Sequence, residues 1–274
     1  MHELEHQRIS VMNQPRPTFS VKEMFSLAGR RALVTGSARG IGRAIARALA
    51  ECGAAVVVHG VRASDALDQS LADVRGFSPA SAAVTGDLGE PGIARDILAA
   101  ATAAVGAPDI VIANASVQIR RPWLAIPEAE ALLQMQVNFH ATFQLFQAAY
   151  PAMSARRWGR LISVGSVQEL RPHNEMPIYA ASKAALENLV RNLAKQCGAD
   201  GVTVNNLCPG VFATDRNAEA LDNPVYAEKV RDAIPLHDFA RPEDAAGTAV
   251  LLCSEAGRYI TGMTLRVDGG MGIA

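Results

Sequence analysis

The feature that most constrains this 274-residue chain is an alternation, from residue 31 onward, of short apolar runs with longer stretches of helical periodicity. The apolar runs span residues 31–35, 54–58, 81–87, 109–115, 159–166, 202–210 and 263–270. Short strands separated by helices are typical of β-α-β units, which build a parallel sheet with helices on both faces. The pattern therefore predicts a single α/β domain over residues 27–274, with a Rossmann-type doubly wound sheet of about seven strands.

The segment that precedes this domain, residues 1–26, is polar and contains Pro15 and Pro17. Such a composition predicts an N-terminal arm that is flexible or binds a partner. His2 and His6 match the HExxH pattern of zinc hydrolases. Because this match precedes two prolines and has no apolar face that could dock it on a scaffold, we predict no metal site.

Composition excludes several classes of function. The formal net charge of -1 provides no electrostatic basis for binding nucleic acid or an anionic membrane. No apolar stretch approaches the ~20 residues that span a bilayer, and the first residues show no secretion signal. The cysteines are far apart and form no CxxC pair: Cys52, Cys197, Cys208 and Cys253. We therefore expect reduced thiols in or near the core of a cytoplasmic protein.

The sequence TGSARGIG at 35–42 follows the first expected strand directly and begins the first helix. At this position the free N–H groups and dipole of a helix N-terminus favour the pyrophosphate of a dinucleotide. Gly36 would allow the tight turn, and Gly40 and Gly42 would allow backbone and cofactor to approach closely. No Lys-Ser/Thr pair follows, which excludes a P-loop. The alternative is an ordinary glycine-rich turn.

Tyr179 and Lys183, in the sequence YAASK, lie four positions apart and would share one face of a helix. A free phenol has a pKa of ~10, which suits it poorly for proton exchange near neutrality. A neighbouring ammonium would lower that pKa. Taken alone, the pair could equally be a tyrosine at a helix start and a solvated lysine.

Together, these motifs give the chain, over about residues 27–274, a resemblance to the short-chain dehydrogenase/reductase family. The matching features are TGxxxGIG at 35–42, GDL at 86–88, an Asn in the central helix, a Ser after the fifth strand, YxxxK at 179–183, PG at 209–210 with Thr214, and ITGMTLRVDGG at 260–270.

The resemblance implies that Asn138, Ser166, Tyr179 and Lys183 are the catalytic residues. In these roles Ser166 would hold the substrate oxygen against the phenol of Tyr179. Lys183 would also bond the nicotinamide ribose, and Asn138 would anchor a water that links Lys183 to solvent. Each residue also has a plain structural reading. Ser166 could cap a strand, Asn138 could satisfy backbone groups, and Lys183 could extend to solvent.

For the cofactor, the resemblance and the loop chemistry predict one set of binding residues: Gly36, Ser37, Arg39, Gly40, Ile41, Gly42, Arg62, Asp87, Leu88, Asn114, Tyr179, Lys183, Pro209, Gly210 and Thr214. Gly60 stands about where an NAD-binding enzyme would place an acid at the end of the second strand. Arg39 and Arg62 could instead pair with a 2′-phosphate. We therefore favour NADP(H), with NAD(H) as the alternative.

One departure from the family pattern is ANAS at 113–116, where NNAG is usual. Asn114 is kept, and Ser116 replaces the glycine. A serine there would stiffen or tilt the loop beneath the nicotinamide.

The substrate pocket should be built by loops 116–123, 168–176 and 212–230, at the carboxyl edge of the sheet. Segment 212–230 is long enough to act as a lid. Gln168, Arg171 and Asn174 are the candidate substrate-binding residues, and the polar loops favour a secondary alcohol or ketone of the sugar, polyol or sugar-acid type. The alternative is a 3-oxoacyl-[acyl-carrier-protein] reductase, which a basic surface beside the mouth would favour. A non-redox or catalytically silent nucleotide-binding protein is the remoter alternative.

The resemblance also implies a homotetramer, with a dimer as the alternative. The apolar helices expected at 130–153 and 242–255 could form the contacts. No nucleic-acid or membrane partner is expected.

Overall fold

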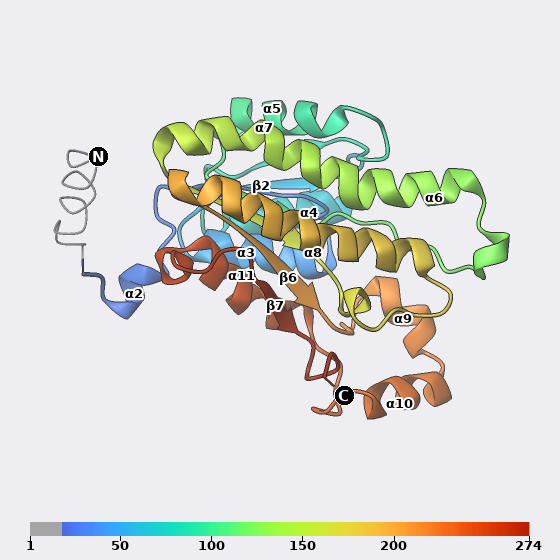
Figure 1. The fold of residues 1–274 in the computed structure, drawn as a ribbon. Coiled ribbons are helices and arrows are strands. Elements are labelled where there is room, and N and C mark those ends of the chain that lie inside the picture. The colour runs from blue at the N-terminus through green and yellow to red at the C-terminus, as the bar shows by residue number, and fades with distance from the viewer. Residues whose placement is uncertain (1–17, 274) are drawn as a thin grey trace, which may run out of the picture.

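The computed structural model describes residues 18–273, which form a parallel sheet of seven strands between two layers of helices (Figure 1). The strands are β1 (Arg31–Val34), β2 (Ala55–Gly60), β3 (Ala82–Thr85), β4 (Ile110–Ala113), β5 (Gly159–Val164), β6 (Val202–Pro209) and β7 (Thr264–Val267). Their order is β3-β2-β1-β4-β5-β6-β7, and every neighbouring pair is parallel. The order reverses between β1 and β4, which is where such sheets bind ligands. The doubly wound fold predicted from the sequence is confirmed.

The helices are α2 (Val21–Met24), α3 (Gly40–Glu51), α4 (Asp65–Arg75), α5 (Ile93–Val105), α6 (Glu128–Met135), α7 (Ala141–Arg156), α8 (Pro177–Cys197), α9 (Asp215–Leu221), α10 (Pro224–Asp232) and α11 (Ala246–Cys253). Helices α3, α4 and α11 pack on one face of the sheet, and α5, α7 and α8 pack on the other. Helices α9 and α10 project beyond the sheet, near the C-terminus (Figure 1).

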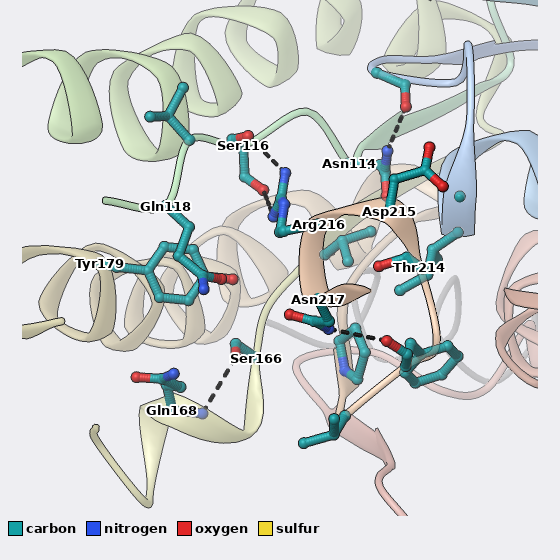
Figure 2. Close-up of a pocket in the computed structure, with 18 of the residues that line it drawn as sticks. Asn114, Ser116, Gln118, Ser166, Gln168, Tyr179, Thr214, Asp215, Arg216 and Asn217 are labelled. Carbon is teal, nitrogen blue, oxygen red and sulfur yellow. Dashed lines mark hydrogen bonds between the residues drawn. The ribbon is translucent and has the colours of Figure 1, made fainter. Parts of the chain in front are cut away.

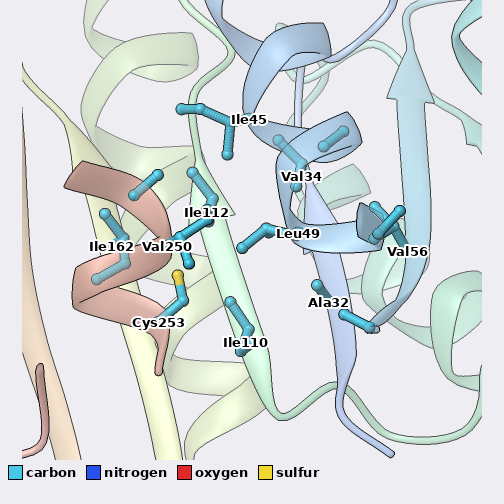
Figure 3. Packing of buried hydrophobic residues seen from close by; sticks show 14 of the residues in the cluster. Ala32, Val34, Ile45, Leu49, Val56, Ile110, Ile112, Ile162, Val250 and Cys253 are labelled. Carbon is cyan, nitrogen blue, oxygen red and sulfur yellow. The ribbon is translucent and has the colours of Figure 1, made fainter. Parts of the chain in front are cut away.

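The core on the α3 side explains why the apolar runs alternate with helices. Ile45 and Leu49 of α3 and Val250 and Cys253 of α11 pack over strand residues such as Ile112 (Figure 3). All five side chains are buried. Helix α11 therefore contributes one apolar face to the core of its own chain.

The apolar segment expected as one helix at 130–153 is interrupted at its centre. Helix α6 passes into α7 through one π-helical turn, Gln136–His140, and Asn138 lies in that turn. Single π-turns inside helices occur frequently at functional sites. The widened turn changes the direction in which Asn138 points, which periodicity alone does not reveal.

The predicted arm lies mostly outside the described residues, including the HExxH match and the two prolines. Its described end contains α2, where Ser20 and Glu23 form a capping box, and Leu27 then enters the core. The boundary at residue 27 stays a prediction. Among residues 18–273, no helix is long and apolar enough to span a membrane, and no cluster of potential metal ligands occurs.

Candidate active site

A cleft of about 1540 Å³ opens at the carboxyl ends of the strands, on both sides of the point where the strand order reverses. Figure 2 shows part of its lining, with Tyr179 and Ser166 on one side and the segment that carries Thr214, Asp215 and Arg216 on the other. Its volume exceeds the ~300–1,000 Å³ of ordinary ligand pockets. The cleft therefore has room for a dinucleotide together with a small substrate.

The glycine turn, the segment from β1 into α3, leaves no space for a side chain at Gly36 or Gly42. Gly36 has a φ of +62°, and a Cβ on it would lie 2.8 Å from the Cα of Ala115. A Cβ on Gly42 would lie 2.4 Å from the Nδ2 atom of Asn114. That amide donates hydrogen bonds to the carbonyl oxygens of Thr35 and Gly36, at 2.9 and 3.0 Å. Asn114 thus ties the loop after β4 to the glycine turn.

The N-terminus of α3 faces this cleft without a side-chain cap, because Arg39 at the N-cap position makes no capping hydrogen bond. Its first backbone N–H groups are therefore available to an anion. The close-packed glycines and the uncapped helix fit the pyrophosphate of a dinucleotide.

Nearly all of the predicted cofactor residues line the cleft: Gly36, Arg39, Gly40, Ile41, Gly42, Arg62, Asp87, Leu88, Asn114, Tyr179, Lys183, Pro209, Gly210 and Thr214. Ser37 is the exception. It is fully buried, and its hydroxyl donates to the carbonyl of Val34 at 2.7 Å and accepts the N–H of His59 at 2.8 Å. Its side chain supports the turn from behind.

His59, at the end of β2, is a cleft residue that the sequence reading did not identify. Its Nδ1 accepts the N–H of Gly36 at 3.0 Å, which leaves Nε2 to donate to the carbonyl of Gly86 at 3.0 Å. Burial lowers the pKa of this imidazole. A neutral His59 thus bridges the glycine turn and the loop after β3. The sequence feature that could have identified His59 is its position as a polar residue in an otherwise apolar strand.

Tyr179 and Lys183 both lie on α8, are both buried, and both line the cleft. The Nζ atom of Lys183 donates to the carbonyl of Val164 at 2.6 Å and lies 5.6 Å from the centre of the Tyr179 ring. Ser166 follows β5 and also lines the cleft. Ser166, Tyr179 and Lys183 therefore line one cleft, and their catalytic roles stay a prediction. The alternative in which Lys183 extends to solvent is wrong, because its side chain is buried.

Burial controls the protonation of this pair. Desolvation, together with the charge of Arg216, lowers the pKa of Lys183 to about 7. Desolvation raises the pKa of the Tyr179 phenol, while Arg216 and hydrogen bonding to Ser166 act in the lowering direction. The net direction for Tyr179 is upward, which contradicts the expectation that its pKa is lowered beside Lys183. The buried ammonium loses its proton first, so it is neutral when the phenol titrates.

Asn138 uses its side-chain amide on nearby groups. Its Oδ1 accepts the N–H of Val117 at 2.8 Å, and its Nδ2 donates to the carbonyl of Val117 at 2.9 Å and to the hydroxyl of Ser182 at 3.0 Å. These bonds fix the loop after β4 against α8, one residue before Lys183. The water that Asn138 is expected to anchor stays a prediction.

The substrate end of the cleft contains the three predicted residues Gln168, Arg171 and Asn174. It also contains Arg216, which the sequence reading did not single out. Arg216 reaches from the start of α9 to Ser116, donating to its hydroxyl and to its carbonyl, both at 2.8 Å (Figure 2). The serine that replaces the family glycine thus contacts segment 212–230, which the sequence predicts to be a lid. Only the position of Arg216 two residues after Thr214 could have indicated this.

Known proteins resemble this chain over most of its length. The sequence model for enoyl-(acyl carrier protein) reductases, a branch of the short-chain dehydrogenase/reductases, matches residues 36–272. The chain is 33% identical over 254 residues to gluconate 5-dehydrogenase of Gluconobacter oxydans, covering 92% of this chain and 98% of that protein.

Two solved structures are similar over the whole fold. A 3-oxoacyl (acyl-carrier-protein) reductase from Agrobacterium tumefaciens C58, with NADP bound, has 38% identity and a TM-score of 0.87 over 92% of this chain and 97% of its own. A gluconate 5-dehydrogenase from Burkholderia cenocepacia J2315, in complex with NADP and tartrate, has 33% identity and a TM-score of 0.87 over 93% and 100%. The chain belongs to the short-chain dehydrogenase/reductase family of NAD(P)-dependent oxidoreductases.

Proposed function

We propose that this protein transfers a hydride between NADP(H) and a secondary alcohol or ketone of the sugar, polyol or sugar-acid type. The observation that carries the proposal is the meeting of Ser166, Tyr179 and Lys183 in one cleft with the glycine turn. A bound nicotinamide supplies or accepts the hydride, and the chain must then manage the proton at the adjoining oxygen.

In this proposal the residues of the chain orient the oxygen and move its proton. The hydroxyl of Ser166 accepts the backbone N–H of Gln168 at 3.2 Å, so its own hydrogen is available to the substrate oxygen. The phenol of Tyr179 exchanges a proton with that oxygen. Lys183 has a pKa of about 7 and exchanges protons readily near neutrality. Its bond to the Val164 carbonyl orients it beside the phenol.

The end of the cleft at β2 supports a preference for NADP(H). Gly60 closes the strand without a carboxylate, and Arg39 and Arg62 line the adjacent wall. Arg39 lies 3.8 Å from Asp215 in an exposed pair, which gives little stabilisation and can exchange for a phosphate. Guanidinium groups suit bidentate binding of a 2′-phosphate.

The substrate end supports an acidic, hydroxylated substrate. Arg120, Arg171 and Arg216 all line it, and each bonds a neutral acceptor. Among the carboxylates whose side chains the structure describes, a set that excludes Glu219, none lies within salt-bridge distance of these three arginines, whereas neighbouring Arg121 is paired with Glu130. Guanidinium groups without a carboxylate partner favour an anionic ligand. A sugar acid provides both the charge and the hydroxyl groups.

The same arginines favour a second candidate, a 3-oxoacyl-[acyl-carrier-protein] reductase, because a basic mouth would also attract an anionic carrier. The two are separated by assaying D-gluconate and other aldonates, neutral sugars, polyols, ketones and acyl thioesters. Each is tested with NADP, NADPH, NAD and NADH, and nicotinamide absorbance is followed. We expect turnover of aldonates with NADP. Turnover confined to acyl thioesters with NADPH would establish the second candidate.

The central test of the mechanism is Tyr179→Phe, which removes the phenolic oxygen and keeps the buried ring. We expect turnover to fall by at least about 10³-fold, because the proton exchange is lost. Cofactor affinity, measured by NADPH fluorescence titration, should change by less than about 3-fold. Undiminished turnover would remove Tyr179 from the mechanism.

We further propose a homo-oligomer, a tetramer or alternatively a dimer, in the cytoplasm. Leu132, Leu133 and Phe143 on α6 and α7 are exposed apolar side chains that support such a contact. The free cysteines, three of which are buried, support a reducing compartment.

A further inference from the structure

A carboxylate lies directly behind Ser166. Glu169, three residues later in the 3₁₀ turn Val167–Glu169, accepts the backbone N–H of Ser166 on its Oε1 at 3.1 Å. Ser166 in turn accepts the backbone N–H of Gln168 on its hydroxyl oxygen. The candidate catalytic serine is therefore the first residue of a capping box. Both its main chain and its hydroxyl oxygen are held by this turn.

The carboxylate is anchored to the sheet on its other side. The Nδ2 of Asn206, on β6, donates to both oxygens of Glu169, at 3.0 and 3.1 Å. The Oδ1 of Asn206 accepts the hydroxyl of Ser163 at 2.7 Å, and Ser163 is its register partner on β5. Hydrogen bonds to a carboxylate are stronger than neutral ones. A continuous set of bonds therefore links two central strands to the backbone of Ser166.

Only glycine fits at position 165, because the carboxylate of Glu169 lies against its backbone. A Cβ at position 165 would lie 1.9 Å from Oε1 of Glu169 and 2.7 Å from Nδ2 of Asn206. The carboxylate thus occupies the space that a side chain at 165 would need. Burial raises the pKa of Glu169, with Asn206 and the Ser166 N–H acting in the opposite direction. Burying a carboxylate is costly, and a 3₁₀ turn of three residues does not require one.

We propose that Glu169 is a positioning residue: anchored on Asn206, it fixes the main chain of Ser166 and thereby directs the serine hydroxyl at the substrate oxygen. This inference rests on the role proposed for Ser166. The proposed role depends on the length of the side chain and not on its charge, because the essential hydrogen bond is the one that Oε1 accepts from the backbone N–H of Ser166. A glutamine at position 169 keeps that reach, since its Oε1 can accept the N–H and the amide of Asn206 can rotate to match. An aspartate keeps the charge and is one methylene too short.

The test compares Glu169→Gln with Glu169→Asp, using D-gluconate with NADP or, failing turnover, whichever substrate of the panel the wild type oxidises. We expect Glu169→Gln to retain kcat within about 3-fold and Glu169→Asp to lose about 10-fold, because small displacements of a reacting group are costly. The KM for NADP should be unchanged in both. Equal loss in both variants would show that the charge matters and would overturn the proposal, as would no loss in Glu169→Asp.

A double-mutant cycle separates positioning from general damage to the fold. In a Ser166→Ala background, Glu169→Asp should change kcat by less than about 2-fold, because there is no hydroxyl left to direct. A further 10-fold loss in that background would show that Glu169 does not act through Ser166. A crystal structure of Glu169→Asp with NADP gives an answer that needs no substrate: Ser166 Oγ should have moved away from the Tyr179 hydroxyl. If Ser166 Oγ has not moved, the proposal is wrong even if the proposed substrate class is right.

Discussion

Lys183 illustrates how strongly burial alters a single residue in this site. Its ammonium is almost fully enclosed and has one carbonyl acceptor, that of Val164. Desolvation therefore lowers its pKa to about 7 from an ordinary value near 10.5. The residue is poised for proton exchange, and the fold is destabilised whenever it must carry a buried charge.

This gives a prediction about pH and stability. The folded-state pKa of Lys183 lies below the unfolded one, so the destabilisation is complete below about pH 7 and disappears as the pH rises toward 10.5. Lys183→Met removes it. We expect the Tm of the variant, relative to that of the wild type, to be highest near pH 6.5 and to fall steadily up to pH 9.5. A difference in Tm independent of pH would show that Lys183 titrates normally.

At the scale of elements, the site is assembled from segments distant in sequence. Helix α8 supplies Tyr179 and Lys183, β5 leads to Ser166, and the start of α9 supplies Arg216. The bonds from Arg216 to Ser116 join the start of α9 to the loop after β4. The α9 segment therefore brings a cation close enough to lower the pKa of both Tyr179 and Lys183.

Arg216→Met should therefore raise the pKa values of these two groups. Because Arg216 is exposed to solvent and therefore screened, we expect the pH profile of kcat to move only slightly, toward higher pH. Ser116→Ala is the matched control, since it removes a hydrogen-bond acceptor and leaves the guanidinium. It should leave the profile in place. Profiles of wild type and Arg216→Met that superimpose would exclude the electrostatic role of Arg216.

At the scale of the whole molecule, the carboxyl ends of the strands form the candidate site, whereas their amino ends contribute to stability. The cleft lies at the carboxyl ends of the strands. An ion-pair cluster lies at their amino ends, around Asp109, which is 2% exposed. Asp109 accepts the backbone and side chain of Arg31, at 3.0 and 2.9 Å, and pairs with Arg156 at 3.1 Å. This cluster ties β1, β4 and α7 together.

Asp109→Asn should therefore weaken the fold and leave the chemistry intact. We expect a loss of about 2 kcal/mol in the free energy of unfolding, because bonds to charged groups are replaced by neutral ones. Urea denaturation measures this change, and kcat at 20 °C should stay within about 2-fold of the wild type. A large fall in kcat for the folded variant would show that Asp109 contributes to catalysis as well as to stability.

The sequence predicted the fold and most of the residues that line the cleft, because both depend on local patterns. Strand-length apolar runs and helical periodicity are visible along the chain, and the glycine turn is contiguous at 35–42. The spacing of Tyr179 and Lys183 on one helix was sufficient to pair them. The π-turn at Asn138 was missed because it is a change of hydrogen bonding within an unbroken apolar segment.

By itself, the sequence determined which side chains are present at the carboxyl edge and what order the strands and helices follow. Only the tertiary structure decided that Glu169 bonds both Ser166 and Asn206, and that Arg216 bonds Ser116. It also decided that burial lowers the pKa of Lys183 to about 7. The physical reason is that desolvation and long-range hydrogen bonds depend on which segments pack together, and no local spacing records that packing.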